Sequence, residues 1–196
     1  MSPCSAPEHS KFKLLKAAFD VFSKHGFDGA TTKLIAQTAQ VNEALIMRHF
    51  KSKEGLFLAV VEQHITCEPC QLAYPPQKTV ADELTKYCED VYNRDSKKAD
   101  FLRIVISHSL RDREFAKRLD DELVDKRLSL LHPRLEELKK KKLIRKNVNI
   151  EEIELMLKHQ IFSAIFFSAI LELNHAKQSK EIMIAAAKSI AEGLAP

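Results

Sequence analysis

The residues with the most evident chemistry in this sequence are cysteines. Cys67 and Cys70 form a C-x-x-C pair, and His64 precedes them to give H-x-x-C-x-x-C, with Cys88 further along the chain. Thiolates and an imidazole suit zinc or another soft metal, and a C-x-x-C pair can also act as a redox switch. No fourth ligand follows at a diagnostic spacing. We therefore expect incidental thiols and no metal site, and we keep a metal- or redox-sensing regulator as an alternative.

Catalytic machinery of the common kinds is not evident in the sequence. No nucleophile–base pair and no pair of acids stands out. The chain has only four glycines and contains neither G-x-G-x-x-G nor G-x-x-x-x-G-K, which argues against nucleotide-dependent enzymes. We therefore predict that the protein is not an enzyme and needs no cofactor. A helical enzyme, or a helical adaptor that does not bind DNA, is the alternative from another class.

Positive charge is concentrated at the start of the chain. Residues 1–53 contain eight lysines and arginines and four acidic residues, so this segment accounts for the net charge of +4 of all 196 residues. An electrostatic bias confined to one segment suits a nucleic-acid-binding head on a neutral body.

The scarcity of glycine and the hydrophobic spacing predict an all-α protein of about nine helices. Four short helices are expected first, capped by Ser10, Thr31, Asn42 and Ser52, with the first ending at Gly26 and the second at a tight break over Gln40 and Val41. Five longer helices are expected over residues 79–93, 98–110, 113–142, 149–174 and 179–194. The third of these should kink or break at Pro133.

The first three helices predict a helix-turn-helix, because a short third helix joined by a tight turn can enter the major groove. The exposed side of the third helix should face the DNA; it carries Asn42, Glu43, Ala44, Leu45, Met47, Arg48 and His49. Thr31, Thr32 and Lys33 begin the second helix, where hydroxyls and backbone N–H groups can meet a phosphate. Leu45 could touch a thymine methyl group, and Arg48 could reach a guanine or a phosphate.

At these residues the sequence resembles the TetR family of bacterial transcriptional regulators. The matching string is ATTKLIAQTAQVNEALIMRHFKSKEGLF at residues 30–57, and KLLKAAFDVFSKHGF at residues 13–27 is similar to the family's first helix. The resemblance implies a helix-turn-helix DNA-binding domain over residues 1–52 and a helical effector-binding and dimerisation domain over residues 53–196. It also implies that Lys53 contacts the DNA backbone, and His49 is placed likewise.

Four positions depart from the family pattern. Gln40 replaces the turn glycine, Ala44 replaces a glycine early in the recognition helix, and Leu45 replaces a frequent threonine. Met47 replaces a tyrosine that commonly meets a phosphate, and a thioether cannot donate a hydrogen bond. These changes leave the predicted fold intact and bear on the DNA sequence that is recognised.

The resemblance implies a homodimer in which the last two helices of each subunit form a four-helix bundle. The sequence supports this independently, because apolar residues between positions 161 and 171 cover more of a helix than one neighbour can bury. The alternative is a central core helix. The expected interface residues are Ile161, Ile165, Phe166, Ile170, Ile182, Ala186 and Ile190.

The family's architecture also implies a ligand cavity among the fifth to eighth helices. Its candidate lining residues are Tyr87, Cys88, Phe101, Val105, His108, Phe162 and Phe166, which are equally compatible with a plain core. The sequence thus predicts a regulator, most simply a repressor, that binds near-palindromic double-stranded operator DNA as a dimer. A small apolar effector would release it by shifting the population of two conformations.

No secretory signal is visible at the start of the chain. The longest apolar stretch, residues 161–173, is too short to cross a bilayer. We therefore expect a cytoplasmic protein with no membrane partner.

Overall fold

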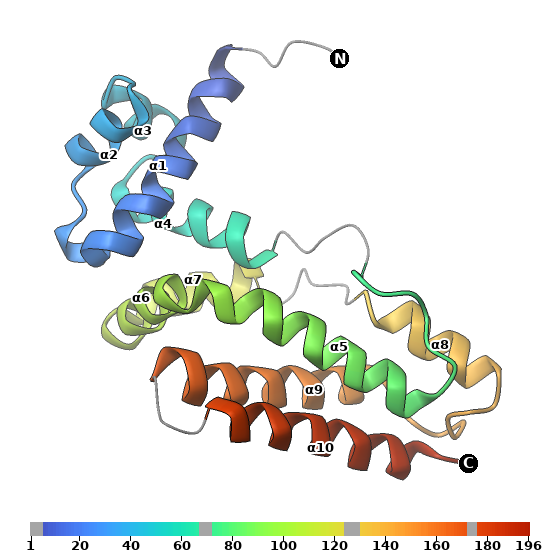
Figure 1. Cartoon of the computed structure of the whole chain (residues 1–196). Coiled ribbons are helices and arrows are strands. Elements are labelled where there is room, and N and C mark those ends of the chain that lie inside the picture. Colours follow the sequence, from blue (N-terminus) through green and yellow to red (C-terminus); the bar gives the residue numbers. More distant parts are fainter. Residues whose placement is uncertain (1–5, 67–71, 124–129, 172–175) are drawn as a thin grey trace. The chain divides into compact units, whose positions relative to one another are not determined.

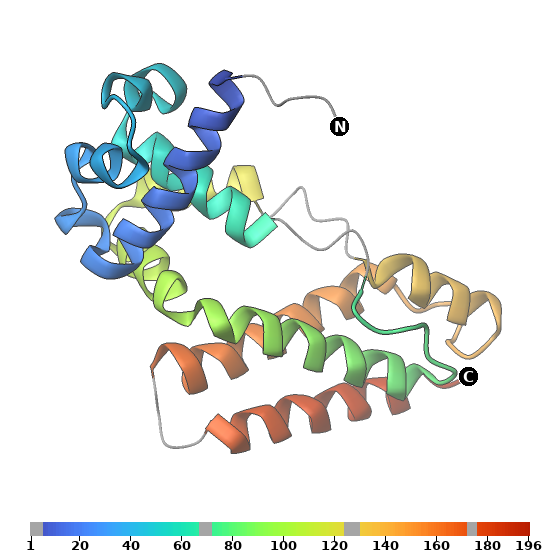
Figure 2. The ribbon, with the colours of Figure 1, turned by 45° about the horizontal axis from the view of Figure 1, so that its top comes forward.

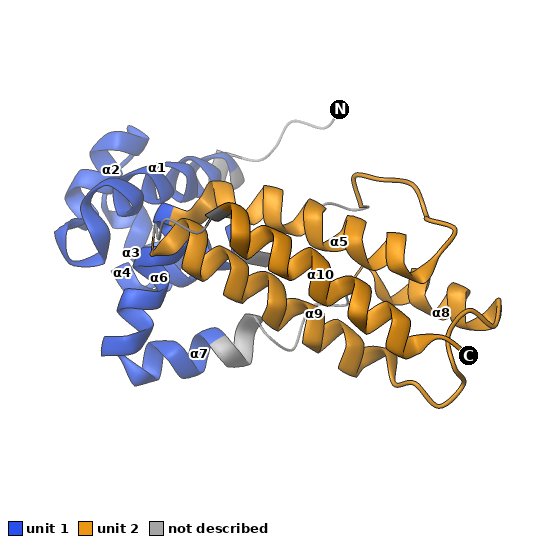
Figure 3. Ribbon diagram, turned by 60° about the horizontal axis from the view of Figure 1, so that its bottom comes forward, with its two compact units in different colours: residues 1–68, 100–127 blue, residues 69–99, 128–196 orange. Residues whose placement is uncertain are grey.

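The computed structural model describes residues 6–66, 72–123, 130–171 and 176–196, and within these ranges it is helical with no strand (Figure 1). The chain divides into two compact units, coloured separately in Figure 3. Unit 1 comprises residues 1–68 and 100–127, and unit 2 comprises residues 69–99 and 128–196. The predicted all-α class is confirmed.

Unit 1 contains the first four helices and two later ones. They are α1 (Ala6–Gly29), α2 (Thr32–Ala39), α3 (Ala44–Phe50), α4 (Lys53–Val61), α6 (Ala99–Arg111) and α7 (Arg113–Leu123), and a π-helical turn, η1 (Glu62–Thr66), continues α4. α1 packs against α2, α3 and α4, and α3 packs against α4. The core of unit 1 is rich in aromatic side chains: Phe22, Phe57 and Phe101 are almost fully buried.

The start of α1 differs from the prediction. The helix begins at Ala6, one turn before the expected cap at Ser10. Pro7 permits this, because proline is tolerated in the first turn, where its missing N–H would have no helical partner. The sequence predicts that this helix ends at Gly26, and the structure shows an interruption of α1 at that residue. Gly26 has φ 70° and ψ 176°, a conformation that favours glycine.

Unit 2 is built from three long helices that lie side by side, α5 (Val80–Asp95), α9 (Ile150–Ile165) and α10 (Ala176–Leu194), as Figures 1 and 2 both show. α8 (His132–Lys140) packs on α9. A 3-10 turn, η2 (Ser96–Lys98), follows α5, and a π-helical turn, η3 (Phe166–Ile170), extends α9. Thr79 caps α5 through its side chain, which accepts a hydrogen bond from the Asp82 N–H group.

A buried ion pair ties α5 to α8 within unit 2. The Glu83 carboxylate, only 1% exposed, accepts a hydrogen bond from Arg134 at 3.0 Å. It also accepts from the Tyr74 hydroxyl at 3.0 Å and from the Gln77 N–H group at 2.7 Å. Burial, and then the Glu83 charge, raise the pKa of the Tyr74 hydroxyl, which therefore stays a hydrogen-bond donor.

The single helix expected over residues 113–142 is two helices among the described residues. α7 ends at Leu123 and α8 begins at His132, with Pro133 in its first turn, so Pro133 opens a helix instead of bending one. The compact units also divide the chain differently from the predicted boundary at residues 52/53, because α4, α6 and α7 belong to unit 1. The division by function into residues 1–52 and 53–196 stays a prediction.

One stretch of unit 2, Ile150–Ile170, is long and apolar enough to cross a membrane by length and composition alone, with a mean hydropathy of 1.3. Its side chains Leu157, Ile161 and Ile165 are buried within the unit, and α9 packs against α5 and α10. Such burial is typical of the core helix of a globular protein.

Candidate nucleic-acid interface

The turn between α2 and α3 is fixed by local hydrogen bonds. The Thr31 hydroxyl accepts from the Leu34 N–H group at 3.1 Å and caps α2 as predicted. Gln40 ends α2 in the left-handed conformation with φ 55°, and the Val41 N–H group donates to the Ala36 carbonyl. Asn42 then accepts from the Ala44 N–H group at 2.8 Å. The turn therefore forms without the glycine that is usual in the family pattern.

α3 has one buried side and one exposed side. Ile46 and Phe50 are buried in the core of unit 1, and this anchors the helix. Met47 is 56% exposed, and Ala44 and Arg48 are exposed as well. The other predicted DNA-facing side chains divide into an exposed group, Thr31, Lys33, Asn42 and Glu43, and a half-buried group, Thr32, Leu45, His49 and Lys53.

The turn from α3 into α4 is equally constrained. Ser52 caps α4 through a bond from the Gly55 N–H group to its hydroxyl at 2.9 Å, as predicted. A side chain at position 55 would collide with the carbonyl oxygen of Phe50, so only glycine permits this close approach. The buried face of α4, which includes Leu56 and Phe57, continues into the core. α3 is thus held by a rigid support, as a reading helix requires.

Two of the predicted phosphate contacts already have partners within the protein. Lys53 donates to the Phe27 carbonyl at 3.0 Å, and its ammonium lies 4.4 Å from the centre of the Phe27 ring. The Thr32 hydroxyl donates to a Glu43 carboxylate oxygen at 2.6 Å. Neither contact has a local signal in the sequence. The residues of the first contact are 26 positions apart in the chain, and those of the second are 11 positions apart.

Comparison with known proteins agrees with this geometry. A family model described as bacterial regulatory proteins of the tetR family matches residues 14–60. The HTH-type transcriptional regulator YvkB of Bacillus subtilis is 46% identical over 52 residues, which cover 26% of this chain and only 28% of that protein. The HTH-type transcriptional repressor NicS of Pseudomonas putida is 30% identical over 158 residues, which cover 76% of this chain and 73% of NicS. The chain belongs to the TetR family.

A solved structure supports the fold of this TetR-family chain over nearly its whole length. A TetR-family regulator from Rhodococcus sp. covers 93% of this chain and 98% of its own, with a TM-score of 0.75 at 12% identity. Membership of the family, and not this likeness of fold, identifies helix-turn-helix transcriptional regulation as the general activity of the protein. The individual DNA-contacting residues, the effector and the dimer interface stay predictions.

The predicted effector-pocket residues are divided between the two units of the TetR-family chain. Phe101, Val105 and His108 are buried in unit 1, whereas Tyr87 and Cys88 are buried in unit 2. Burial raises the pKa of the Cys88 thiol to about 12, so it stays protonated. The other two residues, Phe162 and Phe166, are also in unit 2, where Phe162 is 53% exposed and does not line an interior.

His108 is enclosed by aromatic rings. Its imidazole stacks on Phe27 at 3.9 Å between ring centres and meets Phe115 edge-on at 4.5 Å. It is 6% exposed, and within the described residues its buried Nε2 atom has no hydrogen-bond partner. Burial lowers the pKa of His108 because the cation loses its hydration; Arg111 also lowers it, while Asp112, Asp28 and Glu54 act in the opposite direction.

This burial predicts acid sensitivity. The pKa of His108 is lower in the folded chain than its unfolded value near 6.5, so the unfolded chain binds more protons below that pH. The free energy of unfolding should therefore be unaffected by this group above about pH 7 and fall below about pH 6.5, by up to about 1.4 kcal/mol per pH unit. Urea denaturation at pH 7.5 and 5.5 measures this fall in the free energy of unfolding. His108→Leu should show a smaller loss on acidification, and an equal loss in both proteins would contradict the assignment.

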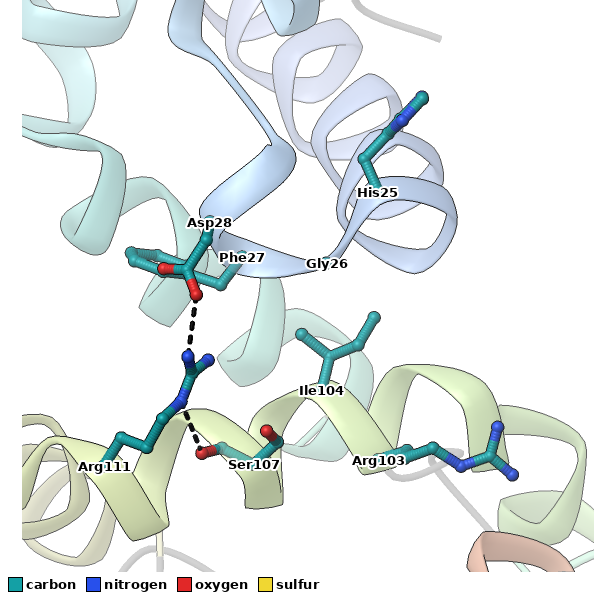
Figure 4. A pocket seen from close by; sticks show the side chains of 8 residues that line it. All are labelled: His25, Gly26, Phe27, Asp28, Arg103, Ile104, Ser107 and Arg111. Atoms are coloured by element: carbon teal, nitrogen blue, oxygen red, sulfur yellow. Dashed lines mark hydrogen bonds and ion pairs between the residues drawn. The ribbon is translucent and has the colours of Figure 1, made fainter.

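The hollow shown in Figure 4 is not the predicted apolar cavity. It has a volume of about 290 Å³ and is lined by His25, Gly26, Phe27 and Asp28 of α1 and by Arg103, Ile104, Ser107 and Arg111 of α6. None of the seven predicted pocket residues is among them. The hollow is open and partly charged, and Arg111 lies between Asp28, at 2.8 Å, and the Ser107 carbonyl.

The residues of the predicted dimer face differ in burial. Ile161, Ile165 and Ile170 are at most 5% exposed and belong to the core of unit 2. Ile182 is 58% exposed as an interface residue should be, while Phe166, Ala186 and Ile190 are half-buried. The exposed hydrophobic side chains on α9, η3 and the residue after it are Leu155, Met156, Phe162, Phe167 and Leu171. The buried members therefore belong to the core of unit 2, and the residues that form the dimer interface stay a prediction.

Cys67 and Cys70 lie outside the described residues. His64, their predicted companion, stacks on Phe19 at 4.0 Å between ring centres. Among the described residues no group of three or more His, Cys, Asp or Glu side chains is placed to hold a metal ion. The metal- or redox-sensing alternative therefore gains no support from the described part of the chain.

Proposed function

We propose that this TetR-family regulator is a dimeric repressor that binds a near-palindromic operator through residues 31–53 and leaves it when a small, largely apolar molecule binds. The observation that carries the proposal is α3, a short helix with a buried anchor at Ile46 and Phe50 and an exposed side at Met47 and Arg48. A helix supported in this way can lie in the major groove. The name of NicS, a transcriptional repressor, favours repression over activation.

A dimer would explain why the operator is near-palindromic. Two copies of α3 about 34 Å apart would contact successive turns of the major groove on one face of the duplex. The exposed hydrophobic side chains of α9 and α10, Phe162 and Ile182 among them, support such an assembly, since a dimer interface would remove them from water. An effector that binds one spacing of the two α3 helices better than another would shift the population.

Selection from a randomised duplex pool tests the proposed activity. The purified protein should enrich a site with two related half-sites in inverted orientation, and heparin should compete in a salt-dependent manner. Retention on the selected duplex that is no stronger than on a scrambled duplex would refute sequence-specific DNA binding by this chain. Enrichment of a single half-site would refute the dimeric mode.

Variants of Lys53 and Leu45 distinguish contact with the DNA backbone from contact with the bases. Lys53→Ala should weaken binding to the selected operator and to a scrambled duplex alike, and should reduce the slope of log K against log salt by about one. Leu45→Ala should instead change the preference among operators, at about 1–3 kcal/mol per misread base pair. Filter binding at several salt concentrations measures both effects.

The internal contact of Lys53 with Phe27 makes a control necessary. Lys53→Ala should also lower the melting temperature, so binding is compared well below it. Lys146→Ala removes an exposed lysine of unit 2 and should leave the salt slope unchanged. If Lys53→Ala destabilises the protein but leaves the slope at its original value, Lys53 is a structural residue and does not contact phosphate.

A further inference from the structure

The contact between Thr32 and Glu43 has a consequence for operator specificity. Thr32 lies in the first turn of α2, and Glu43 directly precedes α3. The Thr32 hydroxyl donates to Glu43 Oε1 at 2.6 Å. Capping of α3 does not need the Glu43 side chain, because Asn42 accepts from the Ala44 N–H group. Within the described residues the second carboxylate oxygen, Oε2, has no hydrogen-bond partner, and the side chain is exposed.

Glu43 is the single acidic residue between positions 31 and 53, a segment that also contains Lys33, Arg48 and Lys53. A carboxylate on a surface that meets DNA is repelled by phosphates and can only accept hydrogen bonds. Its presence therefore favours sequences that offer a donor at that point. In the major groove only the amino groups of cytosine and adenine donate.

The two donors differ in what lies beside them. Adenine presents the N7 acceptor next to its N6 amino group, so a carboxylate with two acceptor oxygens would meet a lone pair there. Cytosine presents its N4 amino group with no acceptor on the same base. We propose, on the basis of the proposed function, that Glu43, oriented by Thr32, is a specificity-determining residue that selects one cytosine in each operator half-site.

Thr32 is then a positioning residue. Its hydroxyl proton is committed to Glu43, which holds the carboxylate in one orientation before DNA arrives. A preorganised side chain loses less conformational freedom on binding and discriminates more sharply between bases. This assignment replaces the phosphate contact that the sequence predicts for the Thr32 hydroxyl.

Sequence selection by variants tests the inference. The wild-type protein should enrich a site with an invariant cytosine in each half-site, and replacing that base pair should weaken binding by about 5- to 150-fold. Glu43→Gln should change the preference at that position from cytosine to adenine, because an amide both accepts and donates and so matches adenine N6 and N7. Glu43→Ala should lose the preference there, and Thr32→Val should keep it but weaken it. Asp20→Asn removes an exposed acid of α1 and should reproduce the wild-type site.

The outcomes distinguish this inference from the proposed function. If the wild-type protein enriches no site, sequence-specific DNA binding is refuted, and the proposed function with it. If the wild-type protein enriches a site that Glu43→Gln and Glu43→Ala reproduce at every position, DNA binding stands and the role of Glu43 is refuted. If Glu43→Gln and Glu43→Ala bind all duplexes more tightly by the same factor, the role of Glu43 in specificity is likewise refuted. Such a uniform gain would mean that Glu43 only repels phosphates.

Discussion

Replacing Phe162 and Phe167 together by lysine should convert the protein from a dimer to a folded monomer and weaken operator binding by about 100-fold or more. Phe162 is 53% exposed and Phe167 is 47% exposed, so neither ring is needed for the core of its own unit. In a dimer both rings would be covered, and four lysines would then face one interface without water. Light scattering at micromolar concentration measures the change in mass.

Two control variants distinguish loss of the dimer from other effects of an added charge. Leu110→Lys places the same charge at an 81% exposed leucine of α6, in unit 1, and should stay dimeric. Ile165→Lys places a charge at a side chain that is 4% exposed and should unfold unit 2, with loss of the helical signal. A wild-type protein that is monomeric at micromolar concentration, or a double variant that stays dimeric, would show that this surface does not hold the dimer.

The second large effect concerns stability. Arg134→Met should lower the free energy of unfolding by about 3 kcal/mol, because it leaves the Glu83 carboxylate buried without its countercharge. The remaining donors to Glu83, from Tyr74 and Gln77, keep the loss at the lower end of the range for broken buried pairs. Urea denaturation followed by circular dichroism measures the difference.

An exposed pair in the same unit provides the comparison. Lys141 lies 3.4 Å from Glu137 with both side chains more than half exposed, so Lys141→Met should leave the stability nearly unchanged. Adding Glu83→Gln to Arg134→Met should recover part of the loss, since the uncompensated charge is removed. Equal effects of Arg134→Met and Lys141→Met would contradict a stabilising role for the buried pair.

Local signals in the sequence predicted the helix-turn-helix correctly. Thr31 and Ser52 each cap the helix that the sequence assigned to them, and Gln40 takes the left-handed conformation that the turn requires. These features depend on neighbours within four residues. A cap, a turn and the hydrophobic spacing of a short amphipathic helix are therefore visible without knowledge of the tertiary structure.

Features that depend on distant residues were not predictable in the same way. An apolar stretch as wide as residues 161–171 does not reveal which stripe faces its own core, and the structure buries Ile165 while it leaves Phe162 and Phe167 exposed. The contacts of Thr32 with Glu43 and of Lys53 with Phe27 depend on how helices pack. The seven predicted pocket residues lie on helices among which the family's architecture implies a cavity, and their division between two units follows from packing that spacing alone does not encode.

Footprinting on the selected duplex tests the central claim most directly, namely that two copies of α3 contact DNA in the major groove. Guanine N7 methylation protection should reveal two protected groups related by a two-fold axis, with centres about 34 Å apart or a multiple of one helical turn. The protection should be lost with the Phe162→Lys, Phe167→Lys double variant at concentrations that saturate the wild-type protein. A bound site without guanine N7 protection, or a single protected group that this double variant preserves, would contradict the account.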